Sequence, residues 1–166
     1  MKKKLARLLN VLSDAKVSFV VVGGYAATLQ GSTYLTQDLD ICYERTSENL
    51  QRLAGALAPL HPRLRGAPDG MPFVLDQHTL KQGMNFTLET DAGDLDLLGE
   101  LSGVGGYSNL HKSADSVELE GRSYRVASLE ELIRSKRAAG RRKDLNVLPE
   151  LEALQELNEK APKKNP

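Results

Sequence analysis

The chain has 166 residues and carries 22 basic and 22 acidic side chains, so its formal net charge at pH 7 is zero. Hydrophobic residues make up 40% and charged residues 27%, values that favour neither a disordered chain nor a membrane protein. The balanced charge argues against a basic surface that coats nucleic acid, and the single cysteine, Cys42, excludes a disulfide within the chain.

The first segment, residues 1–14, is predicted to be an amphipathic helix because leucines recur at helical spacing between residues 5 and 12. The basic start resembles the head of a signal peptide. However, polar residues interrupt the apolar run, and no small-residue cleavage site follows it. We therefore expect a cytoplasmic protein.

Residues 17–22 are almost wholly apolar and β-branched, which predicts a strand that is buried on both faces. Gly23 and Gly24 follow directly, and residues 25–30 predict a short helix that ends at Gly31. Backbone N–H groups at the start of a helix attract phosphate, and glycines let a polyphosphate approach closely. The turn matches neither the phosphate loop that ends in Gly-Lys-Ser/Thr nor the spaced glycines of dinucleotide-binding folds.

Asp38 and Asp40 are alternate residues of the next predicted strand, residues 38–43. Alternate side chains project from one face of a strand, so the two carboxylates share a face with their backbones roughly 6.6 Å apart. Partly desolvated carboxylates at that separation repel by about 2.5 kcal/mol, and a bound Mg²⁺ or Mn²⁺ would reverse this cost. Ligands that are all oxygen favour a hard cation over zinc. Asp-x-Asp pairs also occur by chance on exposed strands, so the pair alone does not establish a site.

The region after this strand is predicted to hold one helix and one long loop. Ser47 begins a capped helix whose leucines at 50, 53 and 57 form an apolar stripe. Prolines and glycines punctuate residues 60–84, which predicts a loop with at most one strand, near residues 73–75.

Two hairpins are predicted in the second half of the chain, with a glycine-rich loop at residues 103–106 between them. Their strands are residues 84–90 with 94–98 and residues 117–119 with 124–126. Ser128 and Glu131 then form a capping box for a helix.

The last part of the chain is basic and helical. A leucine stripe from 145 to 157 continues the helical pattern, and residues 161–166 are predicted to be a disordered tail behind a single domain, residues 1–160. Basic residues gather at Arg134, Lys136, Arg137, Arg141, Arg142 and Lys143, and acidic residues gather at Glu89, Asp91, Asp94, Asp96 and Glu100. An acidic centre opposite a basic wall suits a metal-bound polyphosphate.

Three stretches of the sequence resemble the successive motifs of the DNA polymerase β-like nucleotidyltransferase superfamily. They are Val22-Gly-Gly-Tyr-Ala-Ala, Thr36-Gln-Asp-Leu-Asp-Ile and Gly93-Asp-Leu-Asp-Leu-Leu. Within that superfamily the chain most resembles small bacterial nucleotidyltransferases, typified by the toxins of AbiEii-type and minimal-nucleotidyltransferase toxin–antitoxin systems. Ser128-Leu-Glu-Glu-Leu-Ile-Arg-Ser-Lys and Gly140-Arg-Arg-Lys-Asp-Leu are similar to the lysine-bearing helix and the aspartate motif that close the site there. The resemblance covers residues 17–150.

The resemblance implies an α/β nucleotidyltransferase fold, a mixed central sheet flanked by helices, with C-terminal helices that close the site. It implies that Asp38 and Asp40 bind Mg²⁺ or Mn²⁺ together with a third carboxylate on an adjacent strand. The hydrophobic-Asp-hydrophobic pattern of the family aligns best with Asp96, while Asp94 on the same face is the alternative. Asp96 is expected to help activate the attacking hydroxyl as a base or as a metal ligand.

The same resemblance assigns residues to the nucleotide. Lys136 matches the family lysine that contacts the triphosphate, and Asp144 is expected to orient the basic residues beside it. The full set expected to bind the nucleotide is Gly23, Gly24, Thr36, Lys136, Arg142 and Asp144. One departure is Tyr34, because many relatives carry a basic residue two positions before this threonine.

The predicted activity is metal-dependent transfer of a nucleoside monophosphate from an NTP, such as ATP, to an acceptor hydroxyl with release of pyrophosphate. A tRNA end or a protein side chain is the expected acceptor. A role as a toxin with a cognate antitoxin follows from the resemblance, and no membrane partner is expected. Two alternatives are a small-molecule nucleotidyltransferase of the antibiotic-modifying type and an inactive member that binds nucleotide or RNA. Tyr34 supports the inactive reading, and the intact acidic residues oppose it.

Overall fold

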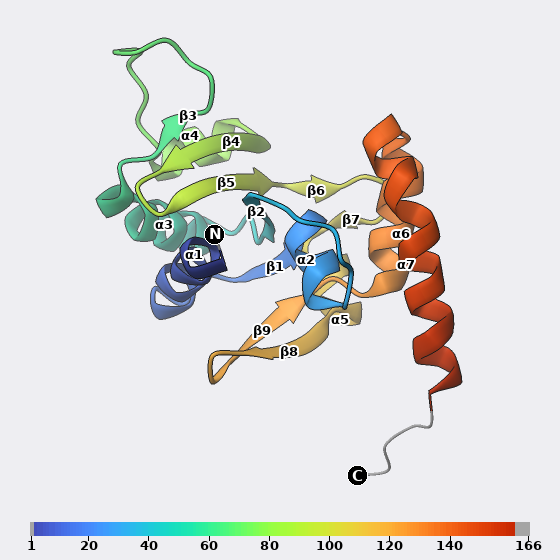
Figure 1. The fold of residues 1–166 in the computed structure, drawn as a ribbon. Helices are drawn as coiled ribbons and strands as arrows, with labels where there is room; N and C mark the ends of the chain where they lie inside the picture. The colour runs from blue at the N-terminus through green and yellow to red at the C-terminus, as the bar shows by residue number, and fades with distance from the viewer. Residues whose placement is uncertain (1, 162–166) are drawn as a thin grey trace.

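The computed structural model describes residues 2–161 and has the predicted α/β architecture, a mixed central sheet flanked by helices (Figure 1). The strands are β1 (Phe19–Val22), β2 (Asp38–Tyr43), β3 (Arg63–Leu64), β4 (Asn85–Thr90), β5 (Gly93–Leu98), β6 (Glu100–Leu101), β7 (Gly105–Gly106), β8 (Asp115–Leu119) and β9 (Arg122–Val126). The helices are α1 (Lys2–Asp14), α2 (Gly23–Leu29), α3 (Ser47–Leu57), α4 (Gln77–Gln82), α5 (Tyr107–Ser113), α6 (Leu129–Ala139) and α7 (Arg142–Lys160), with a 3₁₀ turn at Ala58–Leu60.

The main sheet has the strand order β3-β4-β5-β2-β1-β9-β8, and β6 pairs with β7 separately. Strand β2 runs parallel to β5, and β1 runs parallel to β9, whereas the other neighbouring pairs of the main sheet are antiparallel. The central position of β1 agrees with its sequence, because all four of its residues are buried. The end of β1 and the start of β2 therefore meet in the middle of the sheet.

Helices cover the sheet unevenly. The predicted leucine stripe of α1 is buried, with Leu8, Leu9 and Leu12 fully inaccessible, and this helix packs against α3, β2 and β5. Helices α6 and α7 form a hairpin beside one end of the sheet, away from β3 and β4 (Figure 1). The predicted capping box begins α6, since Ser128 Oγ accepts from the Glu131 N–H and Glu131 Oε2 accepts from the Ser128 N–H, both at 3.3 Å.

Several short elements differ from the sequence-based predictions. The loop predicted at residues 60–84 contains β3 and α4, and residues 73–75 form no strand. Helix α3 is capped by Thr46, whose side chain accepts from the Asn49 N–H, so Ser47 is its first residue. A two-residue strand and a six-residue helix are too short to show a hydrophobic period. The prediction for this region therefore rested on its prolines and glycines, which indicated a loop.

Helix α7 ends at Lys160, and the tail predicted from residue 161 onwards falls almost entirely on residues 162–166, which lie outside the described residues. The single-domain boundary at residue 160 stays a prediction. Among residues 2–161, no helix combines the length and the apolar character that crossing a membrane requires.

Candidate active site

Two parallel strands bring the predicted aspartates together. In the register of β2 and β5, Asp38 lies opposite Asp94 and Asp40 lies opposite Asp96. Each pair therefore projects from the same face of the sheet. One carboxylate oxygen each from Asp38, Asp40 and Asp96 lie within 4.8 Å of one another, and we call these three residues the acidic cluster.

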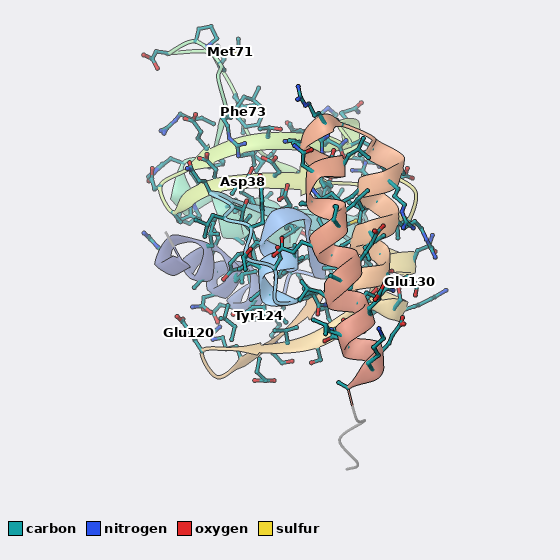
Figure 2. All side chains as sticks on the ribbon, turned by 45° about the vertical axis from the view of Figure 1, so that its right-hand side comes forward. Asp38, Met71, Phe73, Glu120, Tyr124 and Glu130 are labelled. Atoms are coloured by element: carbon teal, nitrogen blue, oxygen red, sulfur yellow. The ribbon has the colours of Figure 1, made fainter. Side chains whose placement is uncertain are left out.

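Asp94 lies beside the acidic cluster but outside it. Its side chain is 42% exposed, compared with 21% for Asp96, and it faces a guanidinium 3.5 Å away. The structure therefore brings Asp96, and not Asp94, together with Asp38 and Asp40, while the role of Asp96 as the third metal-binding carboxylate stays a prediction. In Figure 2, Asp38 lies near the middle of the molecule, beside the helical hairpin. Met71, in contrast, lies on the loop that protrudes at the top of the view.

The two glycines after β1 make room for the aspartates. Gly23 has a positive φ of 66°, and a Cβ atom there would lie 2.2 Å from Asp40 Oδ2. A Cβ atom on Gly24 would lie 2.9 Å from the Cβ of Thr36. These glycines form the first turn of α2, so their small size lets the helix pack directly against β2, which carries Asp38 and Asp40.

Threonine and backbone groups orient two of the carboxylates. Thr36 Oγ1 donates a hydrogen bond of 2.6 Å to Asp38 Oδ1. The pKa of Asp40 is raised to about 7 by burial and by the charges of Asp38 and Asp96, while Lys136 and a hydrogen bond from the Gly24 backbone act in the opposite direction. Burial also raises the pKa of Asp96. The crowding of negative charge is thus only partly relieved by the protein itself.

This donor set fits a divalent cation. Three carboxylates offer hard oxygen ligands within a short span, and Mg²⁺ and Mn²⁺ prefer such ligands. Burial and the neighbouring carboxylates raise the pKa of Asp40, and a cation bound beside it would favour its ionised form.

Opposite the acidic cluster, one buried carboxylate holds two basic side chains. Asp144 is fully buried, and its Oδ1 lies 2.9 Å from Lys136 Nζ while its Oδ2 lies 2.5 Å from Arg141 Nε. Burial raises the pKa of Asp144, but hydrogen bonds from Arg141 and Lys136 hold it below its usual range. The turn at Gly140, which has a φ of 63°, folds α7 back onto α6 and so brings residue 144 to residue 136.

A single cavity joins the two sides. It is lined by the glycines, by the acidic cluster and by the ion-paired group of Lys136, Arg141 and Asp144. Thr36, Tyr34 and Lys143 also line it, whereas Arg142, one of the predicted nucleotide-binding residues, is exposed and does not. The loop that carries Tyr34 is tied to α7, because Glu150 accepts hydrogen bonds from Thr33 N (2.6 Å) and Ser32 Oγ (3.0 Å).

Arg65 is a site residue that the sequence did not indicate. Its Nη2 donates to Asp96 Oδ1 at 2.8 Å and to the Leu88 carbonyl oxygen at 3.1 Å. Arg65 follows β3 in a region that composition marked only as a loop. Its contact with Asp96 depends on its tertiary position across β4, and no local sequence pattern indicates such a position.

No protein-family model matches the chain, and no curated protein matches it significantly by sequence. Among solved structures, it is similar to a candidate nucleotidyltransferase from Thermotoga maritima, with 20% identity, a TM-score of 0.52 and coverage of 94% of this chain and 91% of that one. It is also similar to the lincosamide antibiotic adenylyltransferase LnuA with bound lincomycin, at 15% identity, a TM-score of 0.60 and coverage of 93% and 98%. A third is ANT(2'')-Ia in complex with adenylyl-2''-tobramycin, at 14% identity, a TM-score of 0.55 and coverage of 92% and 93%.

These similarities extend over nearly the whole of both chains in each case. They show that the protein has the nucleotidyltransferase fold, as the motifs of the sequence predicted. The three structures do not bear on the toxin–antitoxin subgroup, which stays a prediction.

Proposed function

We propose that the protein is a metal-dependent nucleotidyltransferase, which transfers a nucleoside monophosphate from an NTP to an acceptor hydroxyl and releases pyrophosphate. The observation that carries this proposal is the cavity in which the acidic cluster faces Lys136 and Arg141. Phosphoryl-transfer sites need a cation and basic side chains on a polyphosphate, because catalysis there is mostly positioning and charge stabilisation. The nucleotidyltransferase fold supports the same conclusion.

Asp38, Asp40 and Asp96 would hold Mg²⁺ or Mn²⁺ in this site. When bound, such a cation supplies stabilisation of charge on the attacking and leaving oxygens. The hydrogen bond from Thr36 keeps the Asp38 carboxylate turned toward its neighbours. Asp96 lies on the β5 side of the acidic cluster, where it would accept the proton of the acceptor hydroxyl or help to orient that hydroxyl.

Lys136 and Arg141 would contact the phosphates of the NTP. Both side chains pair with the buried Asp144, which positions their charged groups at one wall of the cavity. Cationic donors on phosphate oxygens form hydrogen bonds roughly twice as strong as neutral ones. Gly23 and Gly24 would let the polyphosphate approach the backbone, and Arg142 is proposed to act from outside the cavity, on the phosphate or on an RNA backbone.

The proposed acceptor is the end of a tRNA or a protein side chain, and the proposed physiological role is that of a toxin with a cognate antitoxin. Both rest on the resemblance of the motifs to small bacterial nucleotidyltransferases. A second candidate is adenylylation of a small-molecule hydroxyl, favoured by the extensive structural similarity to LnuA and ANT(2'')-Ia.

One experiment separates these acceptors. The protein is incubated with each labelled NTP, Mg²⁺ or Mn²⁺, and in parallel reactions total tRNA, a mixture of proteins, a lincosamide or an aminoglycoside. Label is expected in the tRNA or protein reaction and is expected to disappear in Asp38→Ala and Asp40→Ala. Asp69→Ala, which changes an exposed aspartate of the protruding loop, is the control and should keep the activity. Label that persists in both cluster variants would remove the acidic cluster from the mechanism.

A further inference from the structure

Arg65 reaches the acidic cluster from the edge of the sheet. Its backbone N–H donates to the Thr87 carbonyl at 2.9 Å, which extends the pairing of β3 with β4 by one residue. The side chain then crosses β4, where the Leu88 carbonyl accepts from Nη2. The guanidinium ends beside three carboxylates, 2.8 Å from Asp96 Oδ1, 3.5 Å from Asp94 Oδ2 and 3.9 Å from Asp38 Oδ2.

The contacts of this guanidinium are incomplete. Arg65 Nε is buried, yet it has no hydrogen-bond partner among residues 2–161, because its 3.5 Å approach to Asp94 lacks the geometry of a hydrogen bond. The distance to Asp38 is also too long for one. An arginine that served only to hold two carboxylates would be expected to form a bidentate pair with all its donors satisfied. The guanidinium instead lies among the carboxylates of Asp38, Asp94 and Asp96, and of these three it donates a hydrogen bond to Asp96.

The basic side chains on the opposite wall of the cavity are already paired with another carboxylate. Lys136 forms an ion pair with the buried Asp144 at 2.9 Å, and Arg141 forms one with the same carboxylate at 2.5 Å. In the part of the chain that the structure describes, the ion pairs of Asp38 and Asp96 are both made with Arg65. The acidic cluster therefore has a counter-charge from its own chain, on the side away from α6 and α7.

We propose that Arg65 is a resident counter-cation of the acidic cluster, which gives up Asp38 and Asp96 when a divalent cation binds to them. This inference rests on the proposed function, since it concerns loading of the same site. Two cations that share the same carboxylates repel each other, so Arg65 and the metal ion compete. Arg65 would thus set the cation concentration at which the site fills.

The surroundings of Arg65 allow it to withdraw. It directly precedes Gly66, where an added Cβ atom would meet no other atom within 4 Å. Figure 2 shows Met71 of the protruding loop standing well clear of the sheet. A shift of the guanidinium away from Asp38 and Asp96 therefore does not require the central strands to move.

The test is a calorimetric titration of Mn²⁺ into the full-length protein without nucleotide. Arg65→Gln removes the charge and keeps much of the volume, and we expect it to bind Mn²⁺ at least tenfold more tightly than the wild type. Arg65→Lys keeps the charge and should stay within about threefold of the wild type. Arg63→Gln is the matched control. It removes the same charge from an exposed residue two positions earlier on β3 and should bind like the wild type.

Each outcome is decisive. Tighter binding in Arg65→Gln alone supports the counter-cation. Equal or weaker binding in Arg65→Gln, with a wild type that binds Mn²⁺, overturns it and leaves the proposed function standing. Equally tight binding in Arg65→Gln and Arg65→Lys also overturns it, because the charge would not matter. Absence of Mn²⁺ binding in both the wild type and Arg65→Gln would overturn the metal site of the proposed function itself. Melting temperatures with and without Mn²⁺ establish that each variant is folded.

Discussion

At the scale of single residues, the acidic cluster works against the stability of the metal-free protein. Asp40 is crowded by Asp38 and Asp96, and its pKa is raised to about 7. A carboxyl group whose pKa is higher in the folded than in the unfolded protein stabilises the fold while it is protonated. This stabilisation is complete below about pH 4 and is lost as the pH rises through about 7. Strain of this kind is typical of functional sites.

Asp40→Asn tests this directly. Since the amide does not ionise, the variant should be more stable than the wild type above pH 7 without metal, by as much as about 4 kcal/mol. The difference between the two proteins should shrink as the pH falls toward 4. Urea unfolding in the presence of a chelator, measured at several pH values, gives both free energies. Parallel pH profiles for the two proteins would show that Asp40 ionises normally.

Gly23→Ala is a second test at this scale. The substitution faces both a positive φ and a contact of 2.2 Å with Asp40, so it should destabilise the protein by about 2 kcal/mol or more and weaken Mn²⁺ binding. Gly121→Ala is the matched control. Its φ of 77° is equally unfavourable, but no atom lies within 4 Å of the new Cβ, so about 1 kcal/mol is expected. Equal losses in thermal unfolding would mean that the close approach to Asp40 is unimportant.

At the scale of elements, the hairpin of α6 and α7 builds the basic wall. Gly140 lets the chain reverse, and Asp144 then meets Lys136 across the two helices. The sequence predicted the capping box and the helical character of both segments, because long periodic segments carry a strong local signal. It did not predict β3, α4 or α5, which have too few residues for a period to appear. Arg65 was missed because its contact with Asp96 depends on its tertiary position across β4.

Removing the buried partner should loosen this wall. Asp144→Asn leaves Lys136 and Arg141 without their anionic partner, so ATP should bind about tenfold more weakly and the protein should lose roughly 2 kcal/mol of stability. The control is Glu152→Gln on the same helix, which breaks an exposed ion pair with Arg137 and should cost less than about 0.5 kcal/mol. Calorimetric titration with ATP and thermal unfolding give the two values. ATP affinity unaffected by Asp144→Asn would place the triphosphate elsewhere.

Lys136→Ala tests the contribution of the lysine separately from that of Asp144, its ion-pair partner. If Lys136 contacts the triphosphate, its loss should weaken ATP binding by about tenfold while Mn²⁺ binding without nucleotide changes little. Calorimetric titrations with each ligand distinguish the two effects. An unchanged affinity for ATP would exclude Lys136 from the phosphate site.

At the scale of the whole molecule, the zero net charge conceals a division into two sides. Negative charge is concentrated on one face of β2 and β5, and positive charge is concentrated on α6 and the start of α7. The motifs predicted that these sides belong to one site, but the residues alone did not give the parallel pairing of β2 with β5. That pairing depends on strand order, which is decided by tertiary packing. It aligns Asp40 with Asp96 and so completes the acidic cluster.

The most direct test of this account is the release of pyrophosphate from an NTP in the presence of Mn²⁺ and an acceptor mixture. The wild type should release pyrophosphate in step with labelling of the acceptor. Asp38→Asn/Asp40→Asn should lower the rate by at least about a thousandfold, because two of the three carboxylates proposed to hold the cation are lost at once. Equal pyrophosphate release by the wild type and the double variant, or release of inorganic phosphate instead, would contradict nucleotidyl transfer at the acidic cluster.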